Sequence, residues 1–135
     1  MLERMRPDAR LLAIETGKAF VEKLRAASDD PRLIVVDGSA GDVTRHLADY
    51  DLHAADLILS GLPLSTLDPD EAEAMVVATA LALVPSGMFA AYQIRTTIRP
   101  LIERNFASPR QGYEWWNIPP CHLYWATSSR SYVTA

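Results

Sequence analysis

Glu15 and the segment 37–41 carry residue types that suit the binding of a nucleotide-like ligand. Glu15 follows the apolar run Leu11–Ile14. A carboxylate in such a place can bind both hydroxyls of a ribose, although capping of the following helix suits it equally well. Asp37 ends a second apolar run, and Gly38-Ser39-Ala40-Gly41 follows it, so the backbone there can approach a flat ligand closely. This segment is not a G-x-G-x-x-G motif, and an ordinary strand-to-helix turn is its more frequent interpretation.

The loop Ser60-Gly61-Leu62-Pro63-Leu64 follows a third apolar run. A small, rigid and hydrophobic loop fixes the direction of its backbone carbonyls, and these carbonyls, with the Ser60 hydroxyl, suit the holding of an amine nucleophile. A tight loop that packs Leu62 and Leu64 into the core is an equally weighted alternative. We therefore take Ser60, Gly61, Leu62 and Pro63 as candidate catalytic residues.

Other catalytic chemistries find no support in the sequence. There is no G-x-S-x-G motif, and the one cysteine, Cys121, follows two prolines without an evident base. Cys121 is most simply a buried small residue, and a single cysteine excludes an intramolecular disulfide. His46, His53 and His122 do not fall at metal-ligand spacing, so we expect no metal site.

Alternating strand and helix patterns predict the elements that must position these residues. Short aliphatic runs alternate with longer helical stretches, which is typical of a parallel sheet with helices on both faces. Ligands bind such sheets outside the carboxyl ends of the strands. The predicted strands are Leu11–Ile14, Leu33–Val36, Leu57–Leu59 and Met88–Gln93, and the predicted helices are Lys18–Ala27, Val43–Leu47, one that begins after Asp68 and runs to about Val84, and Thr97–Asn105.

The end of the chain is rich in aromatic residues. Tyr113–Trp116 and His122–Ala126 read as two strands joined by residues 117–120, which predicts a terminal antiparallel hairpin. Tryptophan at alternating strand positions is more often part of a core than a contact to lipid or bases. We therefore expect these rings to be mostly buried.

Composition predicts one globular domain over residues 1–135. The chain is 49% hydrophobic and 22% charged, with a formal net charge of −4, which disfavours a nucleic-acid surface. Its longest apolar run, residues 74–84, is shorter than the roughly 20 residues of a membrane span, and nothing at the N-terminus indicates export. A cytoplasmic location is therefore expected.

Taken in order, the strand-end motifs form a pattern. They are L-L-A-I-E (11–15), V-V-D-G-S-A (35–40), L-S-G-L-P-L (59–64), L-V-P-S-G-M-F (83–89) and W-N-I-P-P (116–120). Together they resemble bacterial phospholipid N-methyltransferases, which are class I S-adenosylmethionine-dependent enzymes related to the rRNA adenine dimethylases. The resemblance covers nearly the whole chain.

This resemblance implies a Rossmann-like α/β fold, S-adenosylmethionine as cofactor, and an amine head group such as phosphatidylethanolamine as substrate at the inner membrane surface. It implies that Glu15 binds the ribose, that Asp37 to Ala40 lie at the adenine, and that Ser60 to Leu64 form the methyl-transfer loop, with Ser60 also at the cofactor. The family has an acid where this chain has Ser39, so the contact to the adenine amino group would pass to Asp37 or Asp42.

One part of the family pattern is absent. Members carry a first strand and a glycine-rich loop before the strand of Glu15, and only residues 1–10 precede that strand here. In the family the absent strand is central, between the strands that end at Glu15 and Ser60. We therefore expect an N-terminally truncated domain, in which those two strands pair directly, exchange strands in a homodimer, or take up a separately supplied piece.

Two other functions remain as alternatives. A non-catalytic remnant that dimerises or binds a partner would explain the absent glycine-rich loop. A nucleic-acid adenine methyltransferase is less favoured, because the loop of those relatives ends in an aromatic residue that stacks on a flipped base, and Leu64 cannot stack.

Overall fold

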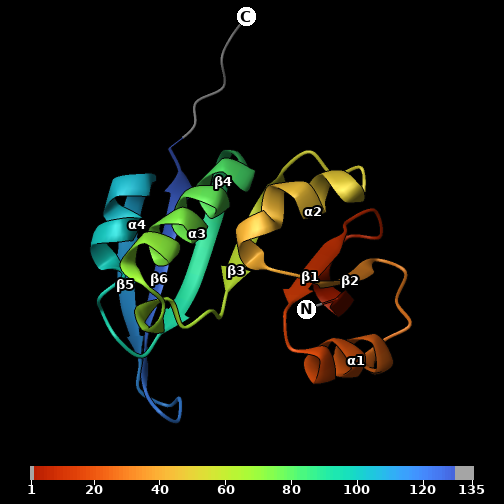
Figure 1. The fold of residues 1–135 in the computed structure, drawn as a ribbon, viewed down its shortest axis with the longest axis horizontal. Coiled ribbons are helices and arrows are strands. Elements are labelled where there is room, and N and C mark those ends of the chain that lie inside the picture. The colour runs from red at the N-terminus through yellow and green to blue at the C-terminus, as the bar shows by residue number, and fades with distance from the viewer. Residues whose placement is uncertain (1, 130–135) are drawn as a thin grey trace, which may run out of the picture.

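The computed structural model describes residues 2–129 of the chain (Figure 1). Every helix and strand expected above is present, with shifted bounds at several ends. The strands are β1 (Leu11–Glu15), β2 (Leu33–Asp37), β3 (Ala55–Ser60), β4 (Leu83–Gln93), β5 (Phe106–Glu114) and β6 (Cys121–Ser128). The α-helices are α1 (Lys18–Ala27), α2 (Val43–Asp49), α3 (Pro69–Ala82) and α4 (Arg99–Asn105). Short 3-10 helices cover Leu2–Arg4, Ala40–Asp42 and Leu64–Thr66.

The strands form two separate sheets. β1 and β2 make a two-stranded parallel sheet, and the other strands make a four-stranded sheet in the order β3-β4-β6-β5. β3 and β4 are parallel, whereas β6 is antiparallel to both β4 and β5. The α/β fold with a terminal antiparallel hairpin is thus confirmed.

β1 and β3 do not pair with each other, so direct pairing, one of the three alternatives expected for these strands, is wrong. Both strands nevertheless lie against the same helices: Leu12 and Ile14 of β1 and Ile58 of β3 pack on the cluster formed by Val43, Leu47 and Ala82. Helix α2 lies over the junction between the two sheets in Figure 1. The apolar contact with the helices therefore holds the sheets together while the facing strand edges stay apart.

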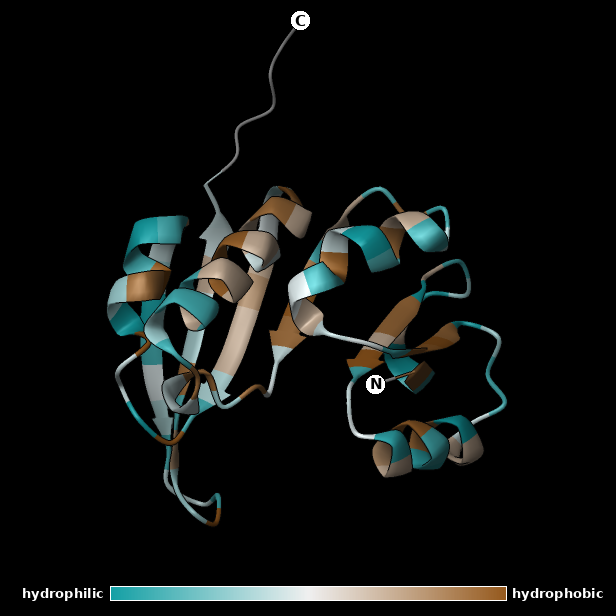
Figure 2. Ribbon diagram, viewed as in Figure 1, coloured by the Kyte–Doolittle hydropathy of each residue, from teal (hydrophilic) through white to brown (hydrophobic). Residues whose placement is uncertain are grey.

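The larger core lies between the four-stranded sheet and the helices α3 and α4. Phe89 and Phe106 stack there with ring centroids 4.8 Å apart, and Val76, Leu83 and Ile102 are fully buried beside them. The most apolar strands, β1, β2 and β3, are brown in Figure 2. The face of the four-stranded sheet that points away from α3 and α4 exposes apolar side chains, namely Leu57, Leu59, Met88, Tyr92 and Trp125.

The junction of α3 and β4 differs from the expectation. The helix begins as predicted, with the Asp68 side chain accepting from the N–H of Asp70 at 3.0 Å, but it ends at Ala82 and the strand starts at Leu83. The predicted turn Pro85-Ser86-Gly87 is an irregularity within β4 instead, where the pairing jumps from Ala55 opposite Leu83 to Leu57 opposite Met88. Ser86 has a φ of 61°, which lets the strand resume after the extra residues.

The hairpin is confirmed, but the expected burial of its tryptophans is wrong. β5 ends at Glu114, so Trp115 and Trp116 lie in the β5–β6 turn and are 74% and 94% exposed. Ile118 in the same turn is 96% exposed. The alternating aromatic residues predicted that the strand continues to Trp116, but the strand ends two residues earlier, at Glu114.

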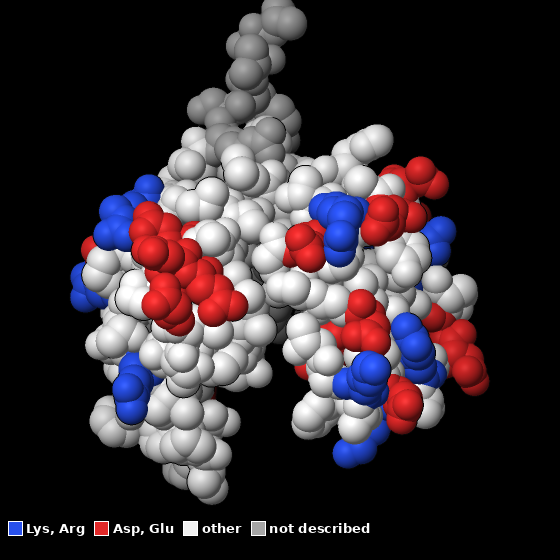
Figure 3. Space-filling model, in the orientation of Figure 1, with Lys and Arg blue, Asp and Glu red and all other residues white. Residues whose placement is uncertain are grey.

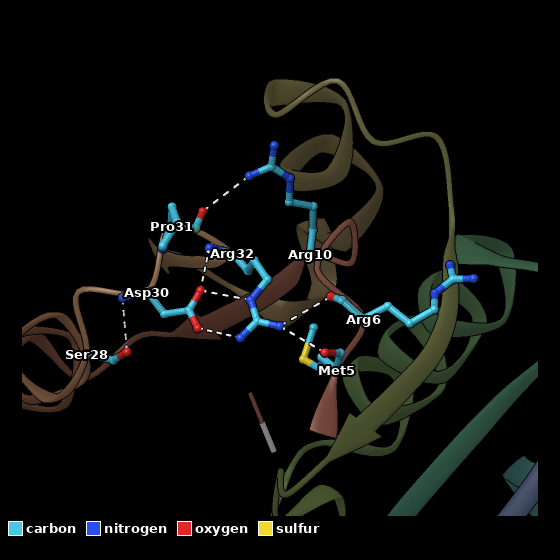
Figure 4. Close-up of polar contacts among 7 residues, drawn as sticks. All are labelled: Met5, Arg6, Arg10, Ser28, Asp30, Pro31 and Arg32. Carbon is cyan, nitrogen blue, oxygen red and sulfur yellow. Dashed lines mark hydrogen bonds and ion pairs between the residues drawn. The ribbon is translucent and has the colours of Figure 1, made fainter. Parts of the chain in front are cut away.

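Arg32 fixes the N-terminal segment against the start of β2 (Figure 4). Its guanidinium binds Asp30, with Nη2 2.6 Å from Oδ2, and donates from Nη1 to the carbonyls of Met5 and Arg6 at 3.0 and 3.2 Å. The same arginine lowers the pKa of Asp30 to about 2 through its hydrogen bonds. One side chain thus connects residues 5–6 to the loop before β2.

Replacing Arg32 by Met is expected to return the pKa of Asp30 toward its ordinary value of 3.8. Because folding lowers this pKa, the ion pair stabilises the fold above pH 3.8 and its contribution is lost as the pH falls through about 2. The carboxyl titration followed by NMR measures the shift. Unfolding of both proteins at pH 7 and at pH 2 should show a smaller difference at pH 2, where mainly the pH-independent bonds of Arg32 to the carbonyls of Met5 and Arg6 remain, and a difference of equal size at both pH values would contradict this assignment.

Replacing Tyr124 by Phe is expected to leave stability unchanged or to raise it by up to about 1 kcal/mol. The Tyr124 hydroxyl is buried, and among the described residues it has no hydrogen-bond partner. Burial also raises the pKa of this phenol. Removing an unsatisfied buried hydroxyl removes a desolvation cost. Urea unfolding measures the change, and a loss above about 1 kcal/mol would show that the hydroxyl is satisfied in solution.

Candidate functional site

The ends of β1 and β2 bring Glu15 and Asp37 side by side. The two residues are opposite each other in the parallel pairing, and the N–H of Gly38 donates to the carbonyl of Glu15 at 3.1 Å. The Glu15 Oε1 accepts from the N–H of Gly17, the N-cap of α1, at 2.8 Å. The capping interpretation of Glu15 therefore holds for one carboxylate oxygen. The other oxygen has no partner among the described residues, so it remains available to a ligand.

His46 holds the loop after β2 and was not singled out from the sequence. It is buried in α2, and its Nε2 lies 3.0 Å from the carbonyl of Ser39, so this nitrogen carries the proton and donates. A Cβ on Gly38 would lie 2.7 Å from that nitrogen. Glycine at position 38 is therefore required by the close approach of His46. The sequence signal is the place of His46 beside Leu47 on the inward face of a short helix.

Polar groups in this loop cap the chain where it turns into α2. The Ser39 hydroxyl accepts from the N–H of Gly41 at 3.1 Å, as the N-cap of the 3-10 helix Ala40–Asp42. Asp42 forms an exposed ion pair with Arg45 at 3.2 Å. Of the two acids considered for an adenine amino group, Asp42 is thus engaged, and Asp37 is the exposed one without a described partner.

The loop after β3 is tied to the end of β4. Gln93 is buried and its Nε2 donates to the carbonyl of Leu62 at 2.5 Å, and the same carbonyl accepts from the N–H of Leu64 at 2.8 Å. The carbonyl of Pro63 accepts from both the N–H and the hydroxyl of Thr66, at 2.9 and 2.8 Å. The carbonyls of Leu62 and Pro63 thus already accept hydrogen bonds within the protein.

Ser60 and Gly61 carry the groups of this loop that a substrate can reach. The Ser60 hydroxyl accepts from the N–H of Leu62 at 3.4 Å, a long contact that leaves its proton free to point elsewhere. Leu64 is buried and Leu62 packs against the same core, so the packing alternative is confirmed. The packing of the leucines fixes the loop that presents Ser60 and Gly61.

Tyr92 adjoins Gly61 and was also missed from the sequence. A Cβ on Gly61 would lie within clashing distance of the Tyr92 hydroxyl, so the phenol lies directly over this glycine. Tyr92 is 49% exposed, although it stands between the buried Ala91 and Gln93 of β4. Alternation along the strand predicts its face but not the contact with the loop of β3.

The predicted site residues thus form two groups at the same edge of the α/β fold. Glu15 lies with residues 37–40 on the two-stranded sheet, and Ser60–Pro63 lie with Tyr92 and Gln93 on the four-stranded sheet. Both groups stand at the carboxyl ends of parallel strands. Figure 3 shows a notch between the two halves of the molecule on the face in view. The hydrogen bonds described above stay within each group.

Two open hollows of the surface lie elsewhere. One of about 530 Å³ is lined by residues of the hairpin, namely Gln111, Gly112, Tyr113, Trp115 and His122. Another of about 270 Å³ lies between α1 and β2, beside Asp30 and Val35. Neither contains a residue of the predicted site, which is consistent with the separation of β1 from β3. Within residues 2–129 no group of three or more His, Cys, Asp or Glu side chains could hold a metal ion.

No protein-family model matches the chain. An ornithine lipid N-methyltransferase of Singulisphaera acidiphila is 26% identical over 124 residues, which are 90% of this chain and 65% of that protein. The chain thus spans less than two thirds of this relative.

Solved methyltransferases share the fold. The N-methyltransferase NodS of Bradyrhizobium japonicum superposes with a TM-score of 0.69 at 13% identity, over 90% of this chain and 74% of that one. Magnesium protoporphyrin IX methyltransferase of Synechocystis, solved with bound S-adenosylmethionine, gives 0.66 at 13% identity, over 90% of this chain and 60% of that one. The chain therefore has a methyltransferase-like α/β fold.

Replacing Gln93 by Leu is expected to lower the free energy of unfolding by about 1 kcal/mol, because one buried hydrogen bond to the Leu62 carbonyl is lost at nearly constant volume. The amide of Leu64 should also exchange faster with deuterium, since the loop is then fixed only by its own turns. The matched control is the exposed Gln111, replaced by Leu. Unchanged exchange at Leu64 in the Gln93→Leu variant would show that this bond does not fix the loop.

Proposed function

We propose that the chain is an S-adenosylmethionine-dependent N-methyltransferase domain that acts on an amine head group of a phospholipid such as phosphatidylethanolamine. The observation that carries the proposal is the arrangement of the strand ends in a methyltransferase-like fold: Glu15 with residues 37–40, and Ser60–Pro63 at the same edge. The lipid substrate is supported by the similarity to an ornithine lipid N-methyltransferase.

The residues around β1 and β2 fit the nucleoside part of the cofactor. The Glu15 oxygen that has no described partner suits a ribose hydroxyl, and the turn to Gly17 holds that carboxylate in place. His46 fixes the carbonyl of Ser39 and so the backbone of residues 38–40, against which a flat adenine would lie. Asp37 is the exposed acid without a described partner, so it suits the adenine amino group.

The loop after β3 suits the orientation of an amine. The cofactor supplies a methyl group on a positively charged sulfur. In the transfer, the amine nitrogen would form a bond to this methyl carbon as the carbon–sulfur bond breaks, the electron pair would remain on sulfur, and the amine proton would pass to solvent. The Ser60 hydroxyl and the Gly61 carbonyl would accept hydrogen bonds from the amine and align its lone pair. A strong base is not required when the amine arrives deprotonated.

The facing edges of β1 and β3 favour one alternative, a non-catalytic domain that binds a partner. Among residues 2–129 no strand joins these edges. A strand from a separate polypeptide or from a second copy would complete the sheet. Without such a strand, the chain would be a non-catalytic domain that binds a partner through the same edges.

Replacing Glu15 by Ala is expected to weaken the binding of S-adenosylhomocysteine about ten- to hundredfold, because hydrogen bonds to a charged group contribute about 1.5–3 kcal/mol. Calorimetric titration of the purified chain measures the affinity, with circular dichroism as the check of folding. The Glu15→Gln variant keeps an oxygen for the N–H of Gly17, so it separates ligand binding from the support of α1. The matched control is Glu22→Ala, an exposed acid on α1.

A folded chain that binds no S-adenosylhomocysteine would contradict the proposed cofactor site and favour the non-catalytic alternative. Binding that is equal in the Glu15→Ala and Glu22→Ala variants would contradict the role of Glu15. Where the cofactor binds, transfer of a labelled methyl group to vesicles with and without phosphatidylethanolamine tests the acceptor.

A further inference from the structure

The turn between β5 and β6, residues 115–120, presents large apolar side chains to solvent. We call these residues the tip. Trp116 and Ile118 are almost fully exposed and Trp115 largely so, whereas most other large apolar side chains of the chain are at least half-buried. The tip projects at the bottom of Figure 1, away from the body of the molecule. Two tryptophans and an isoleucine exposed together at one projection mark a site of contact with another apolar surface.

Local hydrogen bonds hold the tip in one conformation. The N–H of Trp116 donates to the Glu114 carboxylate at 3.0 Å, and the side chain of Asn117 donates to the carbonyl of Pro119 at 2.9 Å and lies 3.5 Å from the Cys121 sulfur. The ring of Trp115 packs edge-on against Tyr113, with centroids 4.5 Å apart. A surface formed in advance loses little conformational entropy when it docks.

The tip carries no charged side chain, which suits a phospholipid surface, and the acid next to it, Glu114, accepts from the N–H of Trp116. No Lys, Arg, Asp or Glu occurs between Trp115 and Ser129, and the tip is white in Figure 3. Tryptophan is the residue type that membrane–water interfaces favour, because its ring is apolar and its N–H can reach water. Ile94 and Arg95 leave the sheet at the same edge, since Gln93 pairs with His122 next to the tip. Both are exposed, and an arginine there attracts anionic head groups.

The tip also lies on the side where a substrate would arrive. β6 runs antiparallel to β4, so the turn before Cys121 extends past the end of β4 at Gln93. Gln93 in turn binds the loop that carries Ser60 and Gly61. A surface that receives the tip would therefore face the proposed methyl-transfer loop.

We propose that the tip, with Ile94 and Arg95, docks on the surface of a phospholipid bilayer and inserts Trp116 and Ile118 among the head groups. This inference deepens the proposed function and rests on it for the choice of a lipid substrate. It assigns a second role to the chain, which is to bring the reaction edge to the membrane. In residues 2–129 no helix is long and apolar enough to cross a bilayer.

The test measures binding of the 135-residue chain to vesicles of phosphatidylethanolamine and phosphatidylglycerol by flotation, without cofactor. The Trp116→Ser/Ile118→Ser variant is expected to bind at least about tenfold more weakly, because two apolar side chains no longer leave water. The Arg95→Gln variant is expected to bind about fivefold more weakly to these anionic vesicles and equally well to uncharged ones. In the wild type, lipids brominated on the acyl chains should quench tryptophan fluorescence, and the tip variant should lose this quenching.

The matched control is Leu81→Ser, which removes a 59%-exposed leucine at the far end of α3. All substituted residues are exposed, so circular dichroism should be unchanged. A wild type that does not float with the vesicles, or a tip variant that floats as the wild type does, would overturn the proposal. Self-association that the tip variant abolishes, without vesicle binding, would assign the tip to a second copy and overturn it as well.

Failure of the docking and failure of the proposed function give different results. Vesicle binding that depends on the tip, with no methyl transfer to phosphatidylethanolamine, would leave the docking intact and contradict the lipid acceptor. Methyl transfer to the lipid at equal rates by the wild type and the tip variant would support the acceptor and contradict the docking.

Discussion

A small apolar cluster between the helices and both sheets is the contact on which the arrangement of this molecule depends. Val43 and Leu47 of α2, with Ala82 of α3, receive side chains from β1 and from β3. Backbone hydrogen bonds between the sheets are absent among the described residues, so no ladder fixes their relative position. Side-chain packing, which is not directional, does so instead. The two halves of the proposed site are therefore aligned by the helices.

Much of the site is built by residues that position others. His46 and Gln93 are buried polar side chains, and each binds a backbone carbonyl in a loop that faces the reaction edge. In each case the buried donor is satisfied by that one carbonyl, so the loop conformation and the burial of the side chain support each other. Strand ends supply the candidate groups, and these two side chains hold the loops that carry them.

The sequence predicted the order of helices and strands and the loops at their ends, because strand periodicity, the cap at Asp68 and the small residues at 38–41 and 60–64 are local signals. It did not predict contacts between distant segments, such as His46 with Ser39 across a helix start or Tyr92 over Gly61. The tip shows the same limit. The spacing of Tyr113 and Trp115 fits a strand, but where pairing with β6 ends is decided by the turn at Asn117.

The free edge of β3 has a consequence for the isolated chain. Leu57 and Leu59 are more than half exposed, and the edge of this strand that faces away from β4 presents unpaired backbone groups within the described structure. Lysine and proline are residues that usually prevent edge-to-edge aggregation of strands. The strand contains neither, and its one charged residue is Asp56. Apolar edges of this kind template intermolecular β-sheet. The edge of β3 is therefore expected to favour association of the isolated chain through added strands as its concentration rises.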